Sequence, residues 1–137
     1  MHILMCMEMT NASQVTNTAH DTTIITGREA GVTETLRTPI DRPGSRAFTR
    51  EQRHAYRQVP GKGTASIELT VNMSDDGESF YVRWSSNRGR AWGKSYRKTC
   101  ANEAAAKLFA AAKWEVMITW LVNVEPVAAA PIDIMRL

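Results

Sequence analysis

Alternation of apolar and polar residues predicts strands in the middle of the chain. Residues 66–73 carry an apolar side chain at every second position, and the alternation returns over residues 80–86. This period of two is typical of strands with one buried face. The segment Asp75-Asp76-Gly77 suits a tight hairpin between them, because Asp and Gly tolerate a positive φ. After a second turn at residues 87–90, a shorter strand over residues 91–98 completes a three-stranded antiparallel sheet.

From Thr99 the pattern changes to the period of a helix, which we expect to run until Pro126. Thr99 is the expected N-cap, and the alanine run 104–106 favours a helix strongly. Spacings of three and four predict one buried stripe, made of Ala105, Leu108, Phe109, Ala112, Val116 and Trp120. The predicted fold class is α+β, a three-stranded antiparallel sheet packed on one long C-terminal helix.

Composition divides the chain into three parts. Residues 1–44 are rich in threonine and hold no Phe, Tyr or Trp, so we expect an irregular N-terminal arm. Within this arm, residues 22–26 are β-prone and suit an edge strand. Residues 45–126 are expected to form the β-β-β-α domain, with a short preceding helix over residues 48–57. Residues 127–137 are the expected C-terminal tail.

Positive charge is concentrated in two blocks. The chain carries 17 Lys and Arg against 14 Asp and Glu, a formal net charge of +3. Residues 42–62 hold five Arg and one Lys against a single Glu, and residues 80–102 hold four Arg and two Lys with no acid. Two basic blocks in an otherwise neutral chain indicate a polyanionic partner. The alternative, a merely solvated basic surface, stays open at this point.

The strands after residue 79 carry the most informative side chains. If the helix covers one face of the sheet, Tyr81, Arg83 and Ser85 belong to the other face. The third strand admits two registers, with either Trp92, Lys94, Tyr96 and Lys98 or Gly93, Ser95 and Arg97 on that free face. The first register interleaves cations and rings, which suits nucleic acid, because cations neutralise phosphates and rings stack on bases. In the alternative, the aromatic residues belong to the core.

A family resemblance covers residues 79–113. The segments Ser79-Phe80-Tyr81-Val82-Arg83-Trp84, Trp92-Gly93-Lys94 and Asn102-Glu103-Ala104-Ala105 resemble the sheet-plus-helix DNA-binding domains of Apetala-type plant factors and phage integrase arms. Lys98-Thr99-Cys100 stands where those domains carry Gly-x-Phe. The resemblance implies a sheet laid in the major groove of duplex DNA. It implies DNA contacts from Arg83, Arg88, Arg90, Trp92, Lys94 and Arg97.

These patterns predict a small non-enzymatic DNA-binding protein of phage or mobile-element origin, with duplex DNA favoured over single strands. The candidate nucleic-acid-binding residues are Arg83, Arg88, Arg90, Trp92, Lys94, Tyr96, Arg97, Lys98, Arg53 and Arg57. One alternative is single-stranded DNA or RNA stacked on Trp84, Trp92 and Tyr96.

The other alternative is a phage-type inhibitor or adaptor that binds a host protein. It is motivated by the apolar end of the predicted helix, made of Met117, Ile118, Leu121 and Val122. The same apolar end would also suit a homodimer.

No catalytic or metal-binding pattern stands out. The two cysteines and three histidines are scattered, so we expect no metal, no cofactor and free thiols typical of the cytoplasm. The acids at residues 75–78 lie in a turn, and no nucleophile motif is present, so we expect no enzyme activity. Residues 1–7 are apolar but lack a basic leader, and no apolar run reaches the ~20 residues that span a bilayer. We therefore expect neither a secretory signal nor a membrane span.

Overall fold

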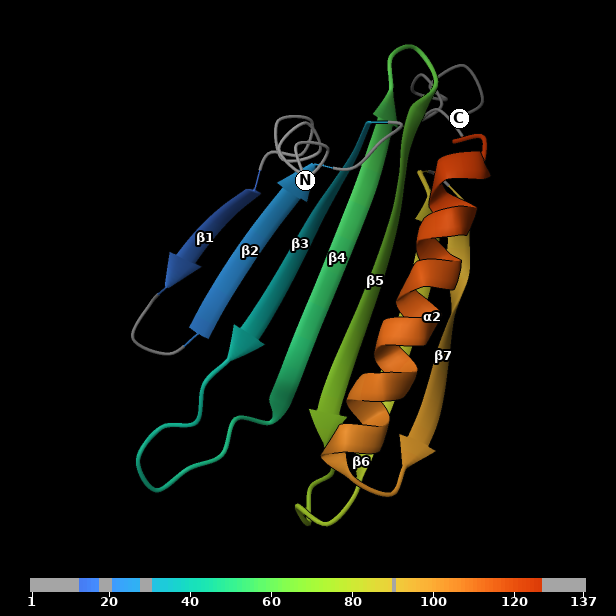
Figure 1. Cartoon of the computed structure of the whole chain (residues 1–137). Coiled ribbons are helices and arrows are strands. Elements are labelled where there is room, and N and C mark those ends of the chain that lie inside the picture. The colour runs from blue at the N-terminus through green and yellow to red at the C-terminus, as the bar shows by residue number, and fades with distance from the viewer. Residues whose placement is uncertain (1–12, 18–20, 28–30, 90, 127–137) are drawn as a thin grey trace, which may run out of the picture.

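The fold is a seven-stranded antiparallel sheet with a long helix on one face (Figure 1). The computed structural model describes residues 13–17, 21–27, 31–89 and 91–126. Each strand pairs with the next one along the chain. The strands are β1 (Ser13–Asn17), β2 (Asp21–Gly27), β3 (Val32–Pro39), β4 (Thr49–Val59), β5 (Gly63–Met73), β6 (Phe80–Arg88) and β7 (Ala91–Cys100), and the helix is α2 (Glu103–Asn123).

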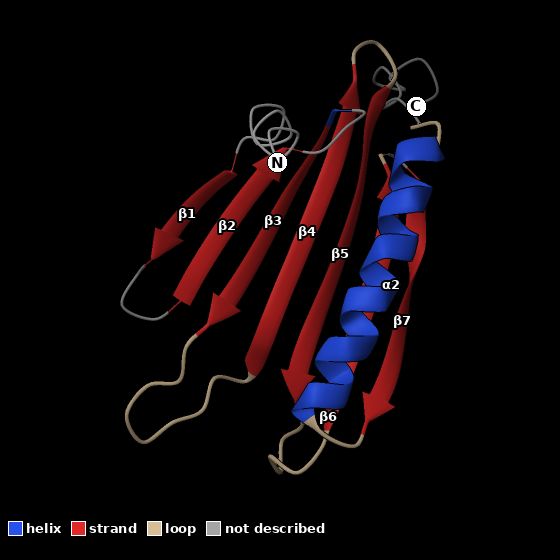
Figure 2. Ribbon diagram, in the orientation of Figure 1, coloured by secondary structure: helices blue, strands red, loops and turns tan. Residues whose placement is uncertain are grey.

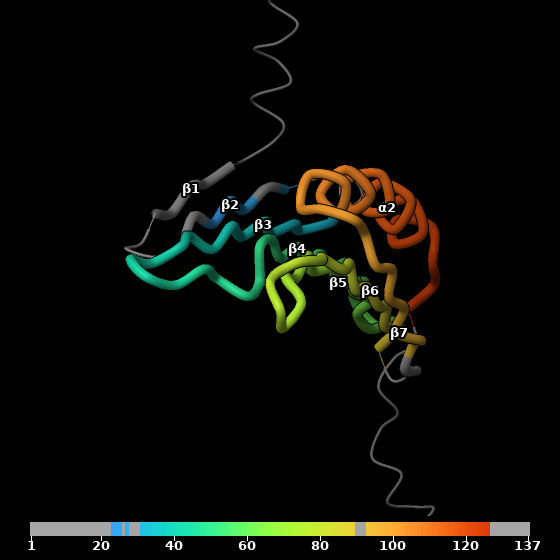
Figure 3. The backbone as a smooth tube through the Cα atoms, turned by 90° about the horizontal axis from the view of Figure 1, so that it is seen from below, coloured from blue at the N-terminus to red at the C-terminus, as the bar shows by residue number. Residues whose placement is uncertain are grey.

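The helix covers only the C-terminal half of the sheet. Its contacts are mainly with β5, β6, β4 and β7, and Figure 3 shows β2 extending beyond it. Figure 2 shows the same division, with the blue helix lying alongside β5, β6 and β7. The predicted class, α+β with a C-terminal helix on an antiparallel sheet, is confirmed. The predicted number of three strands is wrong, because four more strands precede β5.

The prediction of an irregular arm is wrong for β1, β2 and β3. Residues 22–26 do form a strand, but β2 lies between β1 and β3 rather than at an edge of the sheet. Threonine and isoleucine are β-branched, and such side chains favour the extended backbone. Ile24 lies directly opposite Leu36 in the β2–β3 pair. Backbone pairing with two neighbours thus orders a segment that has few apolar side chains. The predicted tail, residues 127–137, lies outside the described residues.

The predicted helix over residues 48–57 is also wrong, since this segment is β4. It pairs with β3 on one side and β5 on the other, with Ala55 opposite Ile67 and Arg53 opposite Leu69. Ala55 is fully buried, while its inward-facing neighbours along the strand are polar. Two backbone ladders outweigh the modest helix propensity of this segment.

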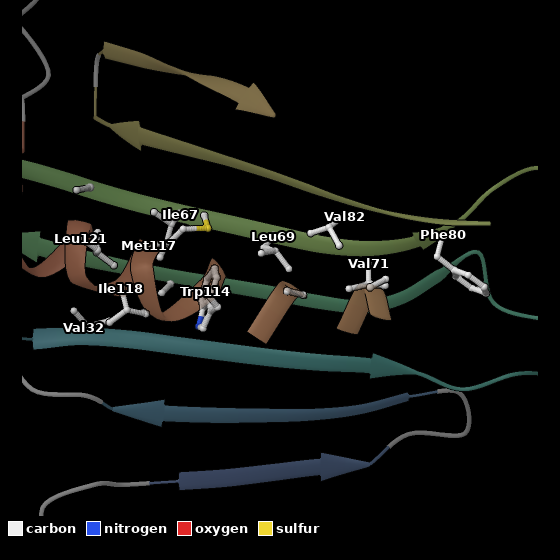
Figure 4. Close-up of a cluster of buried hydrophobic side chains, with 14 residues drawn as sticks. Val32, Ile67, Leu69, Val71, Phe80, Val82, Trp114, Met117, Ile118 and Leu121 are labelled. Atoms are coloured by element: carbon white, nitrogen blue, oxygen red, sulfur yellow. The ribbon is translucent and has the colours of Figure 1, made fainter. Parts of the chain in front are cut away.

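The core lies between α2 and strands β3–β6, with Trp114 at its centre (Figure 4). The sheet contributes the residues expected from its alternation, Ile67, Leu69, Val71, Phe80 and Val82. The helix buries Ala106, Ala110, Trp114, Met117, Ile118 and Leu121. The predicted stripe is therefore wrong: Leu108 is 75% exposed and Val116 is 63% exposed. Alanines at 106 and 110 allow the helix to approach the sheet closely, and Trp114 then fills the space beside them.

The helix begins one turn later than predicted. β7 continues through Cys100, so Thr99 belongs to a strand and the N-cap is Asn102. The Asn102 Oδ1 accepts a hydrogen bond from the Ala105 backbone N–H at 2.8 Å. Glu103 forms ion pairs with Arg46, Arg50 and Lys107 at 3.0, 3.3 and 3.1 Å. Burial alone would raise the pKa of Glu103, but the bond from Lys107 and the charge of Arg50 outweigh burial and lower it.

Arg57 caps the C-terminal end of α2. The last turn of the helix contains no basic residue. Instead, the Arg57 guanidinium reaches from β4 and donates to the Leu121 carbonyl at 2.9 Å and to the Val124 carbonyl. These carbonyls have no partner within the helix, and a cation at this end also suits the helix dipole.

Arg57→Ala is expected to lower the free energy of unfolding by about 2–3 kcal/mol, because charge-assisted hydrogen bonds to half-buried carbonyls are lost. Urea unfolding measures this change. Arg83→Ala is the matched control, since Arg83 is exposed on a nearby strand and its loss should cost less than ~0.5 kcal/mol. Equal losses for the two variants would contradict the capping role of Arg57.

Candidate nucleic-acid interface

Most of the first basic block is occupied by contacts within the protein. Arg46 and Arg50 pair with Glu103, Arg53 pairs with Glu51, and Arg57 caps the helix. The first block also supplies Lys62, which pairs with Glu125 at 2.9 Å. The hydrogen bond and charge of Lys62 lower the pKa of Glu125. The candidates Arg53 and Arg57 therefore lie on β4, facing the helix side of the sheet, and hold the fold together.

The second basic block is divided between the two faces of the sheet. In the β6–β7 pair, Arg97 lies opposite Arg83, whereas Tyr96 lies opposite Trp84 and Lys98 opposite Val82. Val82 belongs to the core under the helix, so Tyr96 and Lys98 share the helix side with it. The second of the two registers is thus correct: Gly93, Ser95 and Arg97 lie on the free face. Lys94, Tyr96 and Lys98, expected on the free face by the first register, lie at the edge of the helix side.

The side chains of two candidate residues near the β6–β7 turn are outside the part of the chain that the structure describes. A third candidate there forms hydrogen bonds within the protein. Arg90 is outside the described residues, and so is the side chain of Trp92, whose backbone belongs to β7. Arg88 is exposed, and its guanidinium donates to the Glu125 carbonyl from Nε at 3.2 Å and from a terminal nitrogen at 2.9 Å. Arg88 therefore assists Arg57 beyond the end of the helix.

The free face opposite the helix carries a polar hollow of ≈ 500 Å³ over β5, β6 and β7. Hydroxyl and amide side chains line most of it, together with Arg83 and Glu68. Next to it, the Arg97 guanidinium lies 3.8 Å from the centre of the Tyr81 ring, so this cation and this ring cover each other. Positive and negative charges are thus mixed on the free face, which makes it a weak attractor for a polyanion.

A bulge in β7 shapes the end of this hollow, because β7 has one more residue than β6 between two paired positions. The register between β6 and β7 shifts between Ser85 and Asn87. Gly93 belongs to this bulge and lies against Ser86, since a Cβ at Gly93 would lie 2.1 Å from the Ser86 carbonyl oxygen. Only glycine permits so close an approach of the two backbones. Gly93 therefore sets the path of β7 as it passes toward the helix.

Lys94, Lys98 and Lys113 gather along the line where β7 meets α2, and we refer to these three residues as the lysine seam. The Lys98 Nζ lies 5.4 Å from the centre of the Phe109 ring. The Lys113 Nζ lies 4.9 Å from the Trp84 ring and 5.8 Å from the Phe109 ring. Lys94 and Lys113 line one cleft beside Trp84. Three cations from a strand and a helix thus surround a single aromatic cluster.

The positive charge of the lysine seam is not neutralised by the described residues. None of the ion pairs among them includes Lys94, Lys98 or Lys113. The described residues that line the adjoining cleft include no acid. Like charges held this close create a positive potential that attracts anions. The lysine seam thus differs from the first basic block, where carboxylates and carbonyls engage the cations.

An aromatic platform stands within the lysine seam. Tyr96 stacks on Trp84 with ring centres 5.8 Å apart and an interplanar angle of 20°, and Trp84 also contacts Phe109 at 5.5 Å. Tyr96 is 51% exposed. The adjoining cleft has a volume of ≈ 190 Å³ and lies between this ring pair and the helix residues Val116 and Trp120. Cations and an accessible ring are therefore combined at one place.

Sequence reasoning missed the contribution of the helix to this place. The predicted stripe places Phe109 and Trp120 in the core. In the structure Phe109 and Lys113 contact Trp84 on β6, and Trp120 lines the cleft with residues of β6 and β7. The spacing of four between Phe109 and Lys113, on a helix that follows a basic strand, was the available signal. The apolar end of the helix is largely covered: Met117, Ile118 and Leu121 are buried in the core, Val122 is half-buried, and Met117 also lines the cleft. Those residues therefore do not form the exposed surface expected for a host protein or a homodimer.

Other functional features are limited among the described residues. They hold no group of three or more His, Cys, Asp or Glu side chains arranged for a metal ion. No helix among them is long and apolar enough to cross a membrane. Cys100 is a half-buried free thiol, and Cys6 lies outside the described residues.

Comparison of the chain with protein-family models, curated proteins and solved structures gave no match. The function is therefore inferred from the side chains of this chain and their arrangement.

Proposed function

We propose that this protein is a non-enzymatic nucleic-acid-binding protein and that the lysine seam is its contact surface. The observation that carries the proposal is the convergence of Lys94, Lys98 and Lys113 on the aromatic cluster of Trp84, Tyr96 and Phe109, with no acid among the described residues that line the adjoining cleft. Ammonium groups neutralise phosphates and release their counterions, which drives most of the affinity. Exposed aromatic rings can stack on the bases of a nucleic acid, whereas most other polyanions have no such rings.

Binding of duplex DNA by a sheet laid in the major groove is poorly supported by the dimensions of this fold. Strands lie about 4.8 Å apart, so seven strands extend over about 29 Å, whereas the major groove is about 12 Å wide. The free face also mixes Arg83 with Glu68. An edge contact through the lysine seam meets neither obstacle, because β7 is the last strand of the sheet.

Binding of the wild-type protein to a labelled 20-nucleotide DNA tests the proposal. Fluorescence anisotropy between 50 and 200 mM salt should give a logarithm of the association constant that falls linearly with the logarithm of salt concentration. A slope of about −2 or steeper is expected if three phosphates are neutralised.

The control is a peptide nucleic acid of the same base sequence, which has the bases but no phosphates and should bind far more weakly. Failure to bind DNA at 50 mM salt would overturn the proposal, and so would equal binding of the uncharged analogue.

A further inference from the structure

We infer that the cleft beside the lysine seam receives one unstacked base, so that the ligand is single-stranded nucleic acid rather than duplex. This inference rests on the proposed function and names the substrate class of the same site. It follows from the size and lining of the cleft, from the exposure of Tyr96, and from Lys94 and Lys113 among the lining residues.

The cleft has the size and lining of a seat for a single planar ring system. Its volume of ≈ 190 Å³ is smaller than the ~300–1,000 Å³ of clefts that hold drug-sized ligands. Apolar and aromatic groups provide most of the wall, from Ile67, Met117, Val116, Trp120 and the Trp84–Tyr96 pair. A nucleobase is flat and apolar on both faces, so it can fill such a space by stacking and packing.

Tyr96 supplies the stacking platform. One face of its ring lies on Trp84, and half of the residue remains exposed. Trp84 is itself held by Phe109 from the helix, so the platform is fixed before a ligand arrives. A preorganised ring loses little conformational freedom on binding, which favours affinity.

The cations lie where the backbone of such a ligand would pass. Lys94 and Lys113 line the cleft that would hold the base, and Lys98 continues along the same edge at Phe109. Phosphates on either side of an inserted base would therefore meet an ammonium group. In a duplex the bases are already paired and stacked, and extruding one costs a few kcal/mol. Single strands do not carry this cost.

The polar groups that face the cleft offer little means of choosing a base. Besides the lysines, the lining residues with polar side-chain atoms are Ser85, Ser86, Tyr96, Trp84 and Trp120. Hydroxyl groups rotate to donate or accept, and the indole N–H groups only donate. Every base has a stacking face, so the site should tolerate different base sequences.

The test compares (dT)20 with a 20-base-pair duplex at the same salt concentration, using the wild-type chain and the variants Tyr96→Ala and Tyr96→Phe. Wild type should bind (dT)20 at least about tenfold more tightly than the duplex. Tyr96→Ala should weaken (dT)20 binding between about 5- and 150-fold, the loss of one stacked base, with little change for the duplex. Tyr96→Phe keeps the ring and should remain within about twofold of wild type, which separates stacking from a general effect on folding.

Two outcomes would overturn the inference while leaving the proposed function intact: equal affinity for the duplex and (dT)20, or unchanged (dT)20 binding in Tyr96→Ala. Absence of binding to both DNAs by the wild-type protein would remove the proposed function itself, and the inference with it. Loss of (dT)20 binding in both Tyr96→Ala and Tyr96→Phe would also count against the inference, because the phenyl ring retains the stacking face.

Discussion

Replacing Lys94, Lys98 and Lys113 together with glutamine is expected to weaken binding to single-stranded DNA on the order of 100-fold at 0.1 M salt. Each phosphate contact on a single strand releases about 0.7 counterion, so losing three contacts removes about 2 from the slope of affinity against salt. Glutamine preserves length and polarity, and two of the three positions lie on an exposed strand edge. Anisotropy titrations at several salt concentrations measure both the affinity and the slope.

The control for this prediction is a second triple variant with the same change in net charge. Arg42, Arg83 and Arg97 are exposed and lie away from the lysine seam, in the loop after β3 and on the free face. Their replacement with glutamine should change affinity by no more than about threefold, since Arg42 is distant and Arg83 and Arg97 point to the opposite face of the sheet, where salt screens their effect on a ligand at the lysine seam. If this second variant loses as much affinity as the first, binding depends on total charge or on the free face, and the assignment of the lysine seam is wrong.

Trp114→Ala is expected to lower the free energy of unfolding by about 3–5 kcal/mol. The residue is 0% exposed, so its removal leaves a cavity between α2 and the sheet. The change also removes the hydrogen bond that the Trp114 indole Nε1 donates to the Glu34 carboxylate on β3. Since whole domains are stable by only about 5–15 kcal/mol, this loss is a large part of the total. Urea unfolding followed by circular dichroism measures it.

Leu108→Ala is the matched control, because it removes a large apolar side chain from the same helix. Leu108 is 75% exposed, so the change should alter the free energy of unfolding by less than ~0.5 kcal/mol. The apolar spacing in the sequence predicts the reverse order, with Leu108 in the core. A large loss in Leu108→Ala together with a small loss in Trp114→Ala would show that the helix packs through the other face.

Strands were predicted correctly where burial of one face produces alternating apolar and polar residues. β5 and β6 alternate because one face of each lies under α2, and the turn between them was recognised from Asp76 and Gly77, whose φ is +74°. β4 has Glu51 and Arg53 among its inward positions, so the alternation that marks a strand is absent. β1 and β2 extend beyond the helix, where no large apolar face is needed, and β3 contributes Val32 to the core. The segments that were missed are thus those that owe their structure to backbone pairing.

The prediction of which face of the helix is buried was wrong for a different reason. Apolar residues occur on nearly every side of α2, so spacing alone allows more than one buried face. The sheet selects the face with Ala106, Ala110 and Trp114, because small residues permit close approach and the indole fills the remaining space. The composition of the candidate site depended on this choice: it turned Lys113 and Phe109 toward β6 and β7. The sequence shows the two basic blocks, but the partners of their side chains depend on where the helix lies.

The order of the strands also has a consequence for how the chain matures during synthesis. Each strand meets its neighbour across a short connection, so pairing can proceed as the chain leaves the ribosome, with little loop-closure entropy. The helix comes after all seven strands. Until residues 103–123 have emerged, a nearly complete sheet presents Ile67, Leu69, Val71 and Val82 to solvent. The nascent chain therefore passes through a stage with an uncovered apolar face, during which association with other chains competes with completion of the fold.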